Sequence, residues 1–291
     1  MGGIYSSAYF KIESIKIEFL PRKIYGLFIG ATKTGKQQTL KGAEAAQRLE
    51  IVFKGIHNVA DTLLIPINLD YTGGVNKELI HSAIKGFNKM MKPGDKFFLF
   101  YTGHGGQLGS ENTHSEFLAC GPESPSWVYD IDLAFWLNEM KPGITKWVVL
   151  DSCHSGGFLD DFINHGLTNF SFLSSAETNI ESYFDKSGFG LFDQALFDGL
   201  KRDQNGKMAV DPEGDGFTFD EIHSYILAWK KSHQYHYTDE IVYKMDIGDP
   251  ILYTDDLFIP VAFQTSDFTD GMPTDQKRNP AAAALYFLLF D

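Results

Sequence analysis

Two apolar runs that each end in a glycine turn constrain the fold of this 291-residue chain most strongly. One is KFFLFYTGHGG, residues 96–106, and the other is KWVVLDSCHSGG, residues 146–157. A short apolar run between turn signals is typical of a strand that is buried on both faces of a parallel sheet. Because His104 follows the first run and Cys153 the second, we expect two reactive side chains at the ends of buried strands.

The same alternation of apolar and amphipathic segments continues along the chain. Strands are predicted for residues 24–31, 63–69, 97–101, 147–150 and 169–175, and helices for residues 42–53, 76–91, 131–140 and 190–200. Residues 217–231 are interpreted as a short strand or turn that enters a helix. This order predicts an α/β fold whose mostly parallel sheet is covered by helices on both faces. Ligands of such sheets bind beyond the carboxyl ends of the strands, where both reactive side chains fall.

The chain is expected to form one domain with two extensions. With 291 residues, 43% of them hydrophobic, it can bury one sizeable core. We assign residues 1–22 to an N-terminal strand or hairpin extension, residues 23–255 to the central domain, and residues 256–291 to a C-terminal extension of unknown function. The apolar tail at residues 281–290 has about half of the roughly 20 residues that a membrane span needs. We therefore expect no membrane span.

Charge and cysteine content narrow the classes of partner. The formal net charge of −13 argues against nucleic acid, because binding a phosphate backbone requires a basic face. An acidic field favours cationic peptides instead. The two cysteines have no C-x-x-C spacing, and no secretory leader precedes them, so a reducing, cytoplasmic location is expected. We favour a monomer.

Cysteine and histidine at neighbouring strand ends can carry out acyl transfer. A thiol attacks carbonyls as its thiolate, and a nearby imidazole can take its proton. A lone cysteine or histidine is more often structural, and Cys120 and His154 are interpreted in that way. A zinc site built from these residues lacks the usual ligand spacing. The coincidence of strand end, glycine turn and spacing favours a catalytic pair, Cys153 and His104.

These motifs resemble those of a known family. YTGHGG is similar to the Tyr-Ser-Gly-His-Gly element of metacaspases, and DSCHSGG is similar to their Asp-x-Cys-His-Ser-Gly element. His104 and Cys153 are 49 residues apart, close to the roughly 50 of caspases. The resemblance, to metacaspases and bacterial orthocaspases, covers roughly residues 25–250 and implies a caspase-like α/β/α sandwich with cysteine endopeptidase activity.

The roles expected within the site follow from this chemistry. Cys153 would attack the scissile carbonyl to give a thioester, and His104 would protonate the leaving amine and then activate water. The backbone N–H groups of Gly105 and Cys153 would stabilise the oxyanion. The chemistry requires no cofactor.

The resemblance also implies a primary specificity pocket. Asp151 and Thr102 occupy the positions that line it, and a carboxylate there favours Arg or Lys at P1. The family usually supplies a second Asp after the first strand, but this chain reads GAEAA at residues 42–46. Glu44 points elsewhere along a helix, and Lys41 would allow the opposite, acidic P1 preference. Asp151 as a cap of the following turn is the structural alternative.

Calcium is the one activator that the resemblance implies. The matching positions are Glu123, Asp130 and Asp160, although the family's second paired Asp is Ile131 here. A solvated turn is the alternative interpretation of residues 160–161. DPEGDGFTFDE at residues 211–221 is similar to an EF-hand loop, but its glutamate falls one residue short of the twelfth position, so we prefer a turn before a helix.

Two other functions remain open, as does maturation. The same fold could serve as a non-cleaving interaction scaffold, although neither Cys153 nor His104 is missing, or as a thiol acyltransferase or ligase. Residues 155–190 are expected to hold only a strand and short connections, with Lys186 as the one Lys or Arg among them. We therefore expect activity without maturation cleavage, with clipping at Lys186 as the alternative.

Overall fold

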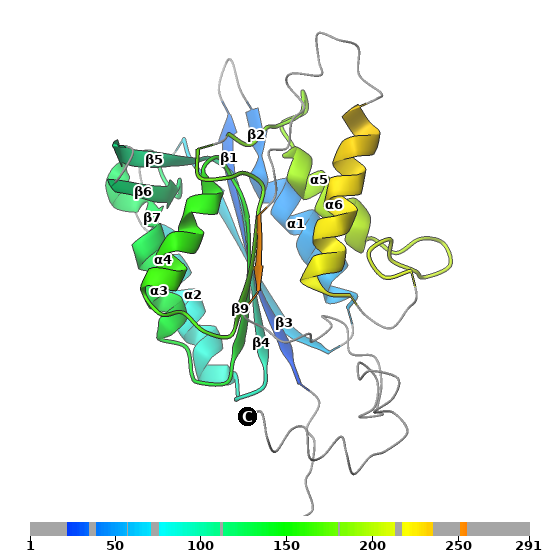
Figure 1. Ribbon diagram of the computed structural model, residues 1–291, viewed down its shortest axis with the longest axis horizontal. Coiled ribbons are helices and arrows are strands. Elements are labelled where there is room, and N and C mark those ends of the chain that lie inside the picture. The colour runs from blue at the N-terminus through cyan, green and yellow to red at the C-terminus, as the bar shows by residue number, and fades with distance from the viewer. Residues whose placement is uncertain are drawn as a thin grey trace, which may run out of the picture.

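A seven-stranded sheet forms the centre of the molecule, between two layers of helices (Figure 1). The structure is a computed structural model that describes residues 22–34, 39–56, 58–70, 76–110, 113–179, 181–212, 217–234 and 251–254. The strands of the sheet are β1 (Ile24–Thr34), β2 (Thr39–Lys41), β3 (Val59–Asn68), β4 (Lys96–Thr102), β8 (Thr145–Asp151), β9 (Phe170–Ser174) and β10 (Ile251–Thr254). Their order is β10-β9-β8-β4-β1-β2, and β3 pairs with β1 along most of its length.

The inner strands run parallel, and the antiparallel pairings lie at the two sides of the sheet. β3, β1, β4, β8 and β9 pair in parallel, whereas β2 pairs antiparallel with the end of β1 and β10 pairs antiparallel with β9. Every residue of β4 and of β8 is buried. Alternate residues enter opposite cores, since Leu27 and Ile29 pack in one apolar cluster and Phe28 in the other. This double burial explains why the strands read as continuous apolar runs.

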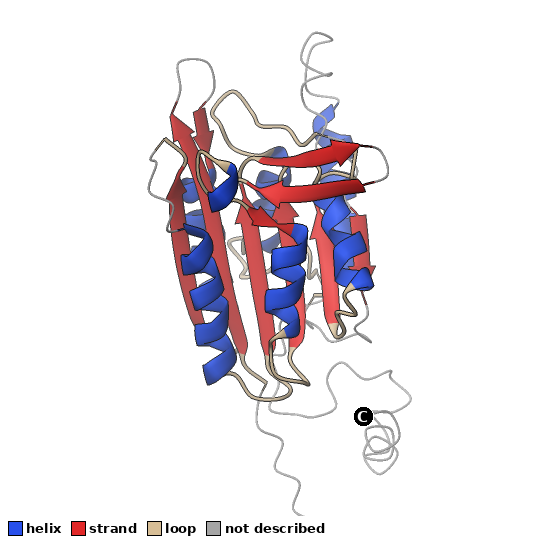
Figure 2. Cartoon of the chain, turned by 90° about the vertical axis from the view of Figure 1, so that its left-hand side faces the viewer, coloured by secondary structure: helices blue, strands red, loops and turns tan. Residues whose placement is uncertain are grey.

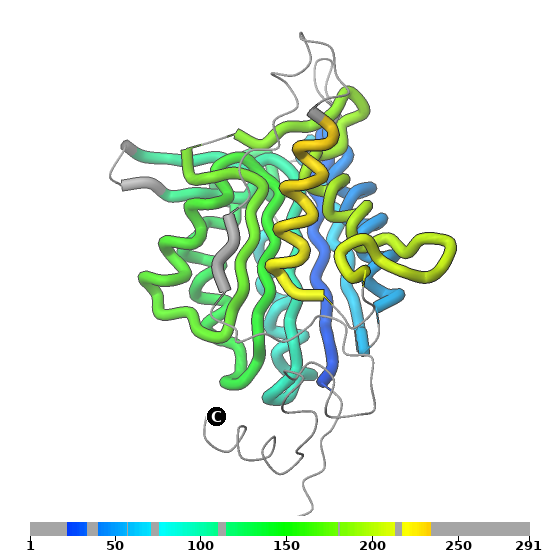
Figure 3. Tube along the Cα trace, turned by 45° about the vertical axis from the view of Figure 1, so that its right-hand side comes forward, coloured from blue at the N-terminus to red at the C-terminus, as the bar shows by residue number. Residues whose placement is uncertain are grey.

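Among the described residues, three helices cover each face of the sheet. The helices α2 (Asn76–Met90), α3 (Asp130–Asn138) and α4 (Phe158–Asn164) lie on one face, in front of the strands in Figure 2. The helices α1 (Gly42–Lys54), α5 (Leu191–Leu200) and α6 (Phe219–Gln234) lie on the other face, where Figure 3 shows α6 running alongside the sheet. Each helix buries a stripe at helical spacing, as α2 does with Ile80, Ile84 and Phe87.

Two glycines let α1 approach the sheet closely. A Cβ added to Gly30 on β1 would lie 2.1 Å from the carbonyl oxygen of Gly42, and one added to Gly42 would lie 2.3 Å from the carbonyl oxygen of Ala31. Since both contacts are to backbone atoms, only glycine fits at either position. This contact holds the start of α1 next to the carboxyl end of the sheet.

A small antiparallel sheet starts directly after His104. It contains β5 (Gly105–Ser110), β6 (Thr113–Leu118) and β7 (Val128–Tyr129), and Figure 2 shows its long strands crossing above the carboxyl ends of the main strands. Two short 3₁₀ turns accompany it, namely η1 (Ser124–Ser126) before β7 and η2 (Ser155–Gly157) after Cys153.

The expected fold class, a caspase-like α/β sandwich with a mostly parallel sheet, is confirmed. The small sheet and α4 were not predicted, and the expectation that residues 155–190 hold only one strand was wrong because η2 and α4 fall there. α4 has seven residues, too few for a clear helical period. The predicted extensions at residues 1–22 and 256–291 lie outside the described residues, apart from residue 22. Within the described part of the chain, no helix combines the length and apolarity needed to cross a bilayer.

Candidate active site

Two turns meet at the carboxyl edge of the main sheet. β4 ends at Thr102 and β8 ends at Asp151, and these two residues are paired in the parallel register. The N–H of Gly103 donates a hydrogen bond of 3.1 Å to the carbonyl oxygen of Asp151. His104 and Cys153 each follow two residues later, so both belong to turns at the same edge.

The backbones of the two turns are in direct contact. A Cβ on Gly105 would lie 2.6 Å from the carbonyl oxygen of Cys153 and 2.6 Å from Oγ of Ser152. The His104 turn is itself anchored, because its carbonyl oxygen accepts hydrogen bonds from Tyr101 Oη at 2.7 Å and from the Ala119 N–H at 2.8 Å. The glycine predicted to supply an oxyanion donor therefore lies beside the backbone of the predicted nucleophile.

The side chains of Cys153 and His104 share one neighbour, residues 181–190, which we call the covering segment. The Cys153 thiol donates to the carbonyl oxygen of Ser182 at 3.6 Å. The His104 ring contacts the Phe184 ring edge-on, with 6.2 Å between the centroids. Both side chains are only partly exposed. The sulfur and the imidazole thus both face the first residues of the covering segment.

Burial favours the neutral forms of this pair. Burial is the main cause that raises the pKa of the Cys153 thiol, and the charges of Glu181 and Asp151 raise it further. Burial lowers the pKa of His104, and Lys33 lowers it further. A neutral imidazole can accept the thiol proton as a base, so the arrangement fits a general-base mechanism better than a preformed thiolate–imidazolium pair.

The remaining cysteine and the neighbouring histidine have structural surroundings. Cys120 is fully buried, as expected, and burial raises its pKa to about 12. His154 adopts φ of 60°, and its Nδ1 lies 2.8 Å from the carbonyl oxygen of Thr178. Among the described residues, the side chains that lie close enough together to hold a metal are Glu116, Asp130 and Asp161.

The carboxyl group of Asp151 is fully buried next to the nucleophile turn. Ser182 Oγ donates to its Oδ1 at 3.1 Å, and Thr102 Oγ1 lies 3.4 Å from its Oδ2. Thr102 Oγ1 also lies 3.2 Å from Oδ2 of Asp193, a residue of α5 that the sequence did not single out. Burial raises the pKa of Asp151 to about 6 despite hydrogen bonds from Ser175, Ser182 and Thr102. Burial and the charge of Asp151 raise the pKa of Asp193 well above its usual value.

A second group of acids gathers beneath the turn that follows Cys153. Carboxylate oxygens of Glu116, Asp130 and Asp161 all lie within 4.8 Å of one another. Of the residues expected to bind calcium, only Asp130 belongs to this group. Glu123 is exposed before η1 and Asp160 is exposed on α4. Neighbouring residues of a helix point about 100° apart, so Asp161 faces the acids when Asp160 does not.

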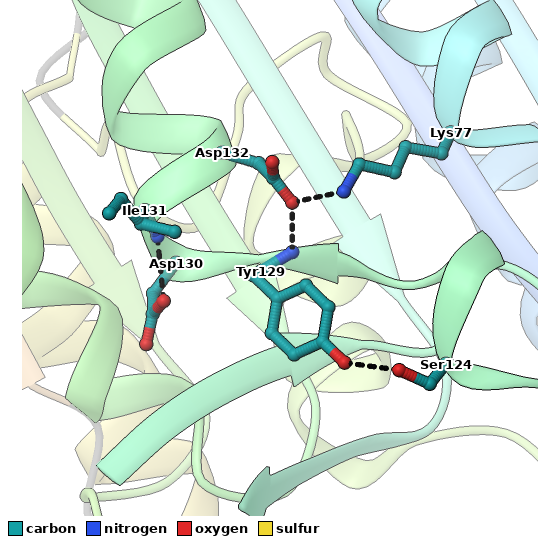
Figure 4. Close-up of polar contacts among 6 residues, drawn as sticks. All are labelled: Lys77, Ser124, Tyr129, Asp130, Ile131 and Asp132. Atoms are coloured by element: carbon teal, nitrogen blue, oxygen red, sulfur yellow. Dashed lines mark hydrogen bonds and ion pairs between the residues drawn. The ribbon is translucent and has the colours of Figure 1, made fainter. Parts of the chain in front are cut away.

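Asp130 is turned toward this group by the start of α3. Figure 4 shows its side chain apart from that of Asp132, which pairs with Lys77 and accepts a hydrogen bond of 3.0 Å from the Tyr129 N–H. Oδ1 of Asp130 accepts a hydrogen bond of 2.6 Å from the Ile131 N–H. Its other oxygen, Oδ2, accepts from the N–H of Glu116 at 2.6 Å.

The acids repel one another electrostatically. Burial, followed by contact with Glu116, raises the pKa of Asp130 to about 6, and burial and Asp130 raise the pKa of Asp161. Gln107 Nε2 donates to Glu116 Oε1 at 2.8 Å. A Cβ on Gly157 would lie 2.2 Å from Cδ of Glu116, so the acid group packs directly against η2. Sequence alone did not indicate Glu116 because it lies on a short strand far from the other acids along the chain.

The fold and site define a class of protein, a caspase-like α/β sandwich with a cysteine and a histidine at neighbouring strand ends. Residues 27–162 match the family described as metacaspase, peptidase C14 domain. This part of the chain is therefore similar to a metacaspase peptidase C14 domain, and both predicted catalytic residues lie within the matched range.

Two individual comparisons accompany this match. The chain is similar to Metacaspase-7 of Arabidopsis thaliana, with 32% identity over 104 residues, which are 34% of this chain and 26% of that relative. The chain thus spans about a quarter of the relative's length. It also resembles the crystal structure of protein GSU0716 from Geobacter sulfurreducens, with a TM-score of 0.52, 15% identity, and coverage of 87% of this chain and 98% of that one. At this identity, the second likeness concerns the fold alone.

Proposed function

We propose that this protein is a cysteine endopeptidase that uses Cys153 as nucleophile and His104 as general base and acid. The observation that carries the proposal is that, within the range similar to a metacaspase peptidase C14 domain, both turns touch at Gly105 and both side chains face residues 182–184. A thiol and a neutral imidazole at one sheet edge are the minimum that acyl transfer requires.

The reaction proceeds in two halves. His104 takes the thiol proton as Cys153 attacks the scissile carbonyl, and the N–H groups of Gly105 and Cys153 stabilise the oxyanion. The tetrahedral intermediate collapses to a thioester, and the amine leaves with the proton from His104. Water then attacks the thioester while His104 accepts its proton, and the carboxylic acid departs as the thiol re-forms.

We propose Arg or Lys at P1, bound by Asp151 with Thr102 beside it. Asp151 lies two residues before the nucleophile and its carboxyl is fully buried, so a cation that reached it would gain a strong, charge-assisted pair. The alternative acidic preference relies on Lys41, whose ammonium lies 3.5 Å from Glu44 Oε2 and over the ring of Phe189. These contacts occupy Lys41 and favour the basic preference.

We also propose calcium as an activator, at the group formed by Glu116, Asp130 and Asp161. The three carboxylates fit a hard divalent cation, because oxygen is its preferred ligand. Burial, and after it the neighbouring acids, raise the pKa of Asp130 and of Asp161. A bound ion would supply positive charge that relieves this repulsion. Since Glu116 packs against Gly157, an ordered acid group would hold η2 and the Cys153 turn in place.

The test is a set of fluorogenic peptides with Arg, Lys, Asp, Asn or Leu at P1, assayed with and without calcium. Turnover should require Cys153 and His104, and Cys153→Ala should abolish it. Cleavage that survives in Cys153→Ala would refute the mechanism, and a preference for Asp would refute the pocket. An inert wild type with intact fold would support the scaffold alternative.

Two further measurements separate the remaining alternatives. An added amine nucleophile that captures the acyl group in preference to water would identify a transferase or ligase. Mass spectrometry of the active protein tests maturation, because intact chain should be active, whereas activity that appears only with clipping after Lys186 would show the opposite.

A further inference from the structure

Asp193 is a buried acid that the proposed chemistry has not used. It lies in the first turn of α5, where the Gly190 N–H donates to its Oδ2 at 3.1 Å. Through Thr102 Oγ1, which is 3.2 Å from Asp193 Oδ2 and 3.4 Å from Asp151 Oδ2, the two acids share one hydroxyl proton. A Cβ on Gly190 would lie 2.2 Å from Asp151 Oδ2 and 3.1 Å from Asp193 Oδ2, so this glycine leaves space for both carboxyl groups.

This acid pair is short of positive charge. In the described part of the chain, neither Asp151 nor Asp193 forms an ion pair. The cation that acts on Asp193 is Arg48 of α1, and its guanidinium lies over the rings of Phe197 and Phe189, at 4.3 and 5.0 Å from their centroids. Two buried acids with one distant cation are unfavourable, since buried carboxylates are normally paired.

The pair lies beside the nucleophile. Asp151 is two residues before Cys153, and Ser182 contacts both, since its hydroxyl donates to Asp151 and its carbonyl oxygen accepts from the Cys153 thiol. A group that took the place of Ser182 would therefore reach Asp151 and the sulfur together, and the Thr102 hydroxyl links Asp151 to Asp193. A guanidinium suits this position, because its planar N–H donors can bond to two carboxylates at once.

We propose that Asp193 is the second acid of the primary specificity pocket and binds the P1 Arg or Lys side chain together with Asp151, where Ser182 now lies. This assignment rests on the proposed function. α1 has Ala46, buried in an apolar cluster, at the position where the metacaspase resemblance leads one to expect an acid. α5 packs against α1, so the acid comes from the neighbouring helix.

Binding of a cation in this pocket should release a proton. The unliganded pair retains a proton at mildly acidic pH because burial raises the pKa of both acids. A guanidinium favours the doubly ionised pair, so the proton leaves to solvent as the cation binds. The titratable and charged groups that bear on the pair from the surrounding elements are Arg48 on α1, Tyr101 on β4 and Cys153 in its turn, and Glu181 in the covering segment acts on Cys153.

The first experiment compares Asp193→Asn with wild type on peptides that differ only in Arg, Lys, citrulline or Leu at P1. Citrulline is the neutral analogue of Arg. We expect kcat/KM for Arg and Lys to fall by about tenfold or more, mainly through KM, while citrulline changes little. Asp198→Asn, which neutralises an exposed acid on the same helix, is the matched control. Thermal unfolding verifies that each variant is folded.

The outcomes separate this assignment from the proposed function. A wild type that prefers Arg over citrulline, with a folded Asp193→Asn that keeps the same ratio, overturns the role of Asp193 alone. A wild type without that preference overturns the basic pocket of the proposed function itself, and this assignment with it.

A second measurement does not depend on how Asp193→Asn folds. Cys153→Ala protein is titrated calorimetrically with the Arg peptide near pH 6, in two buffers of different ionisation enthalpy. The heats should show proton release for the Arg peptide and none for the citrulline peptide. Equal proton exchange for both peptides would overturn the assignment.

Discussion

Replacing Asp151 by Asn should stabilise the protein at neutral and alkaline pH. The carboxyl is fully buried, and its pKa rises from 3.8 in the unfolded chain to about 6 in the folded one. The folded state therefore holds this proton more tightly, and stability falls as pH rises from about 4 through 6. The full loss is about 3 kcal/mol, since each tenfold change in the ionisation equilibrium corresponds to about 1.4 kcal/mol.

Asparagine has the same shape but no charge to bury. Its amide oxygen can accept from Ser182 Oγ, and its NH₂ can donate to Thr102 Oγ1, whose hydroxyl then donates to Asp193 Oδ2. The difference in free energy of unfolding between Asp151→Asn and wild type should grow by about 2 kcal/mol from about pH 4.5 to about pH 8. For a domain of this size, that corresponds to a rise of roughly 4–8 °C in the Tm difference.

The measurement is guanidinium or thermal unfolding of wild type and Asp151→Asn across that pH range. The control for neutralising a carboxylate is Asp198→Asn. Asp198 is an exposed acid on α5 whose Oδ2 accepts a hydrogen bond of 3.1 Å from Trp229 Nε1. A gain that stays constant with pH, or an Asn variant that is less stable at pH 8, would refute the reasoning that an ionised Asp151 costs the folded state free energy.

Three other perturbations test the site. Gly105→Ala places a Cβ 2.6 Å from the carbonyl oxygen of Cys153. Because the two turns must then move apart, kcat/KM should fall by about 100-fold while a cooperative unfolding transition remains. Unchanged activity would contradict the contact between the turns. Glu116→Gln should abolish the rise in Tm that calcium produces, whereas Glu123→Gln, at an exposed position, should keep it; the reverse pattern would relocate the ion. Alkylation of Cys153 by iodoacetamide should accelerate up to about pH 9 and beyond, because its pKa is raised, while buried Cys120 stays unmodified in peptide maps. A rate that reached its plateau near neutral pH would show a preformed thiolate.

Much of the fold and part of the site could be predicted from local pattern. Strands buried on both faces, such as β4 and β8, read as unbroken apolar runs, and α2 shows its buried stripe directly in its spacing. In parallel strands the carboxyl ends meet at one edge, which was enough to predict that the turns carrying His104 and Cys153 lie at the same edge of the sheet. The metacaspase resemblance also indicated Asp130, which lies in the acid group with Glu116 and Asp161.

Other parts of the site left no local signal. Asp193 occupies the first turn of α5, where an acid is ordinarily a helix cap, and nothing in its neighbourhood indicates that Asp151 lies opposite. Glu116 and Asp161 come from a short strand and a seven-residue helix, and neither element has a period that shows which way its acid points. The covering segment has no periodicity, so its contact with the nucleophile could not be anticipated.

The amino-acid sequence by itself determined the layered α/β architecture and the presence of a thiol and an imidazole at adjacent strand ends. This was possible because strands that are buried on both faces and pair in parallel show short-range hydrophobic patterns. Only the tertiary structure decided which acids face one another. Such pairs depend on how helices such as α5 and segments such as residues 181–190 pack over the sheet edge, and packing between elements distant in the chain leaves no period in the sequence.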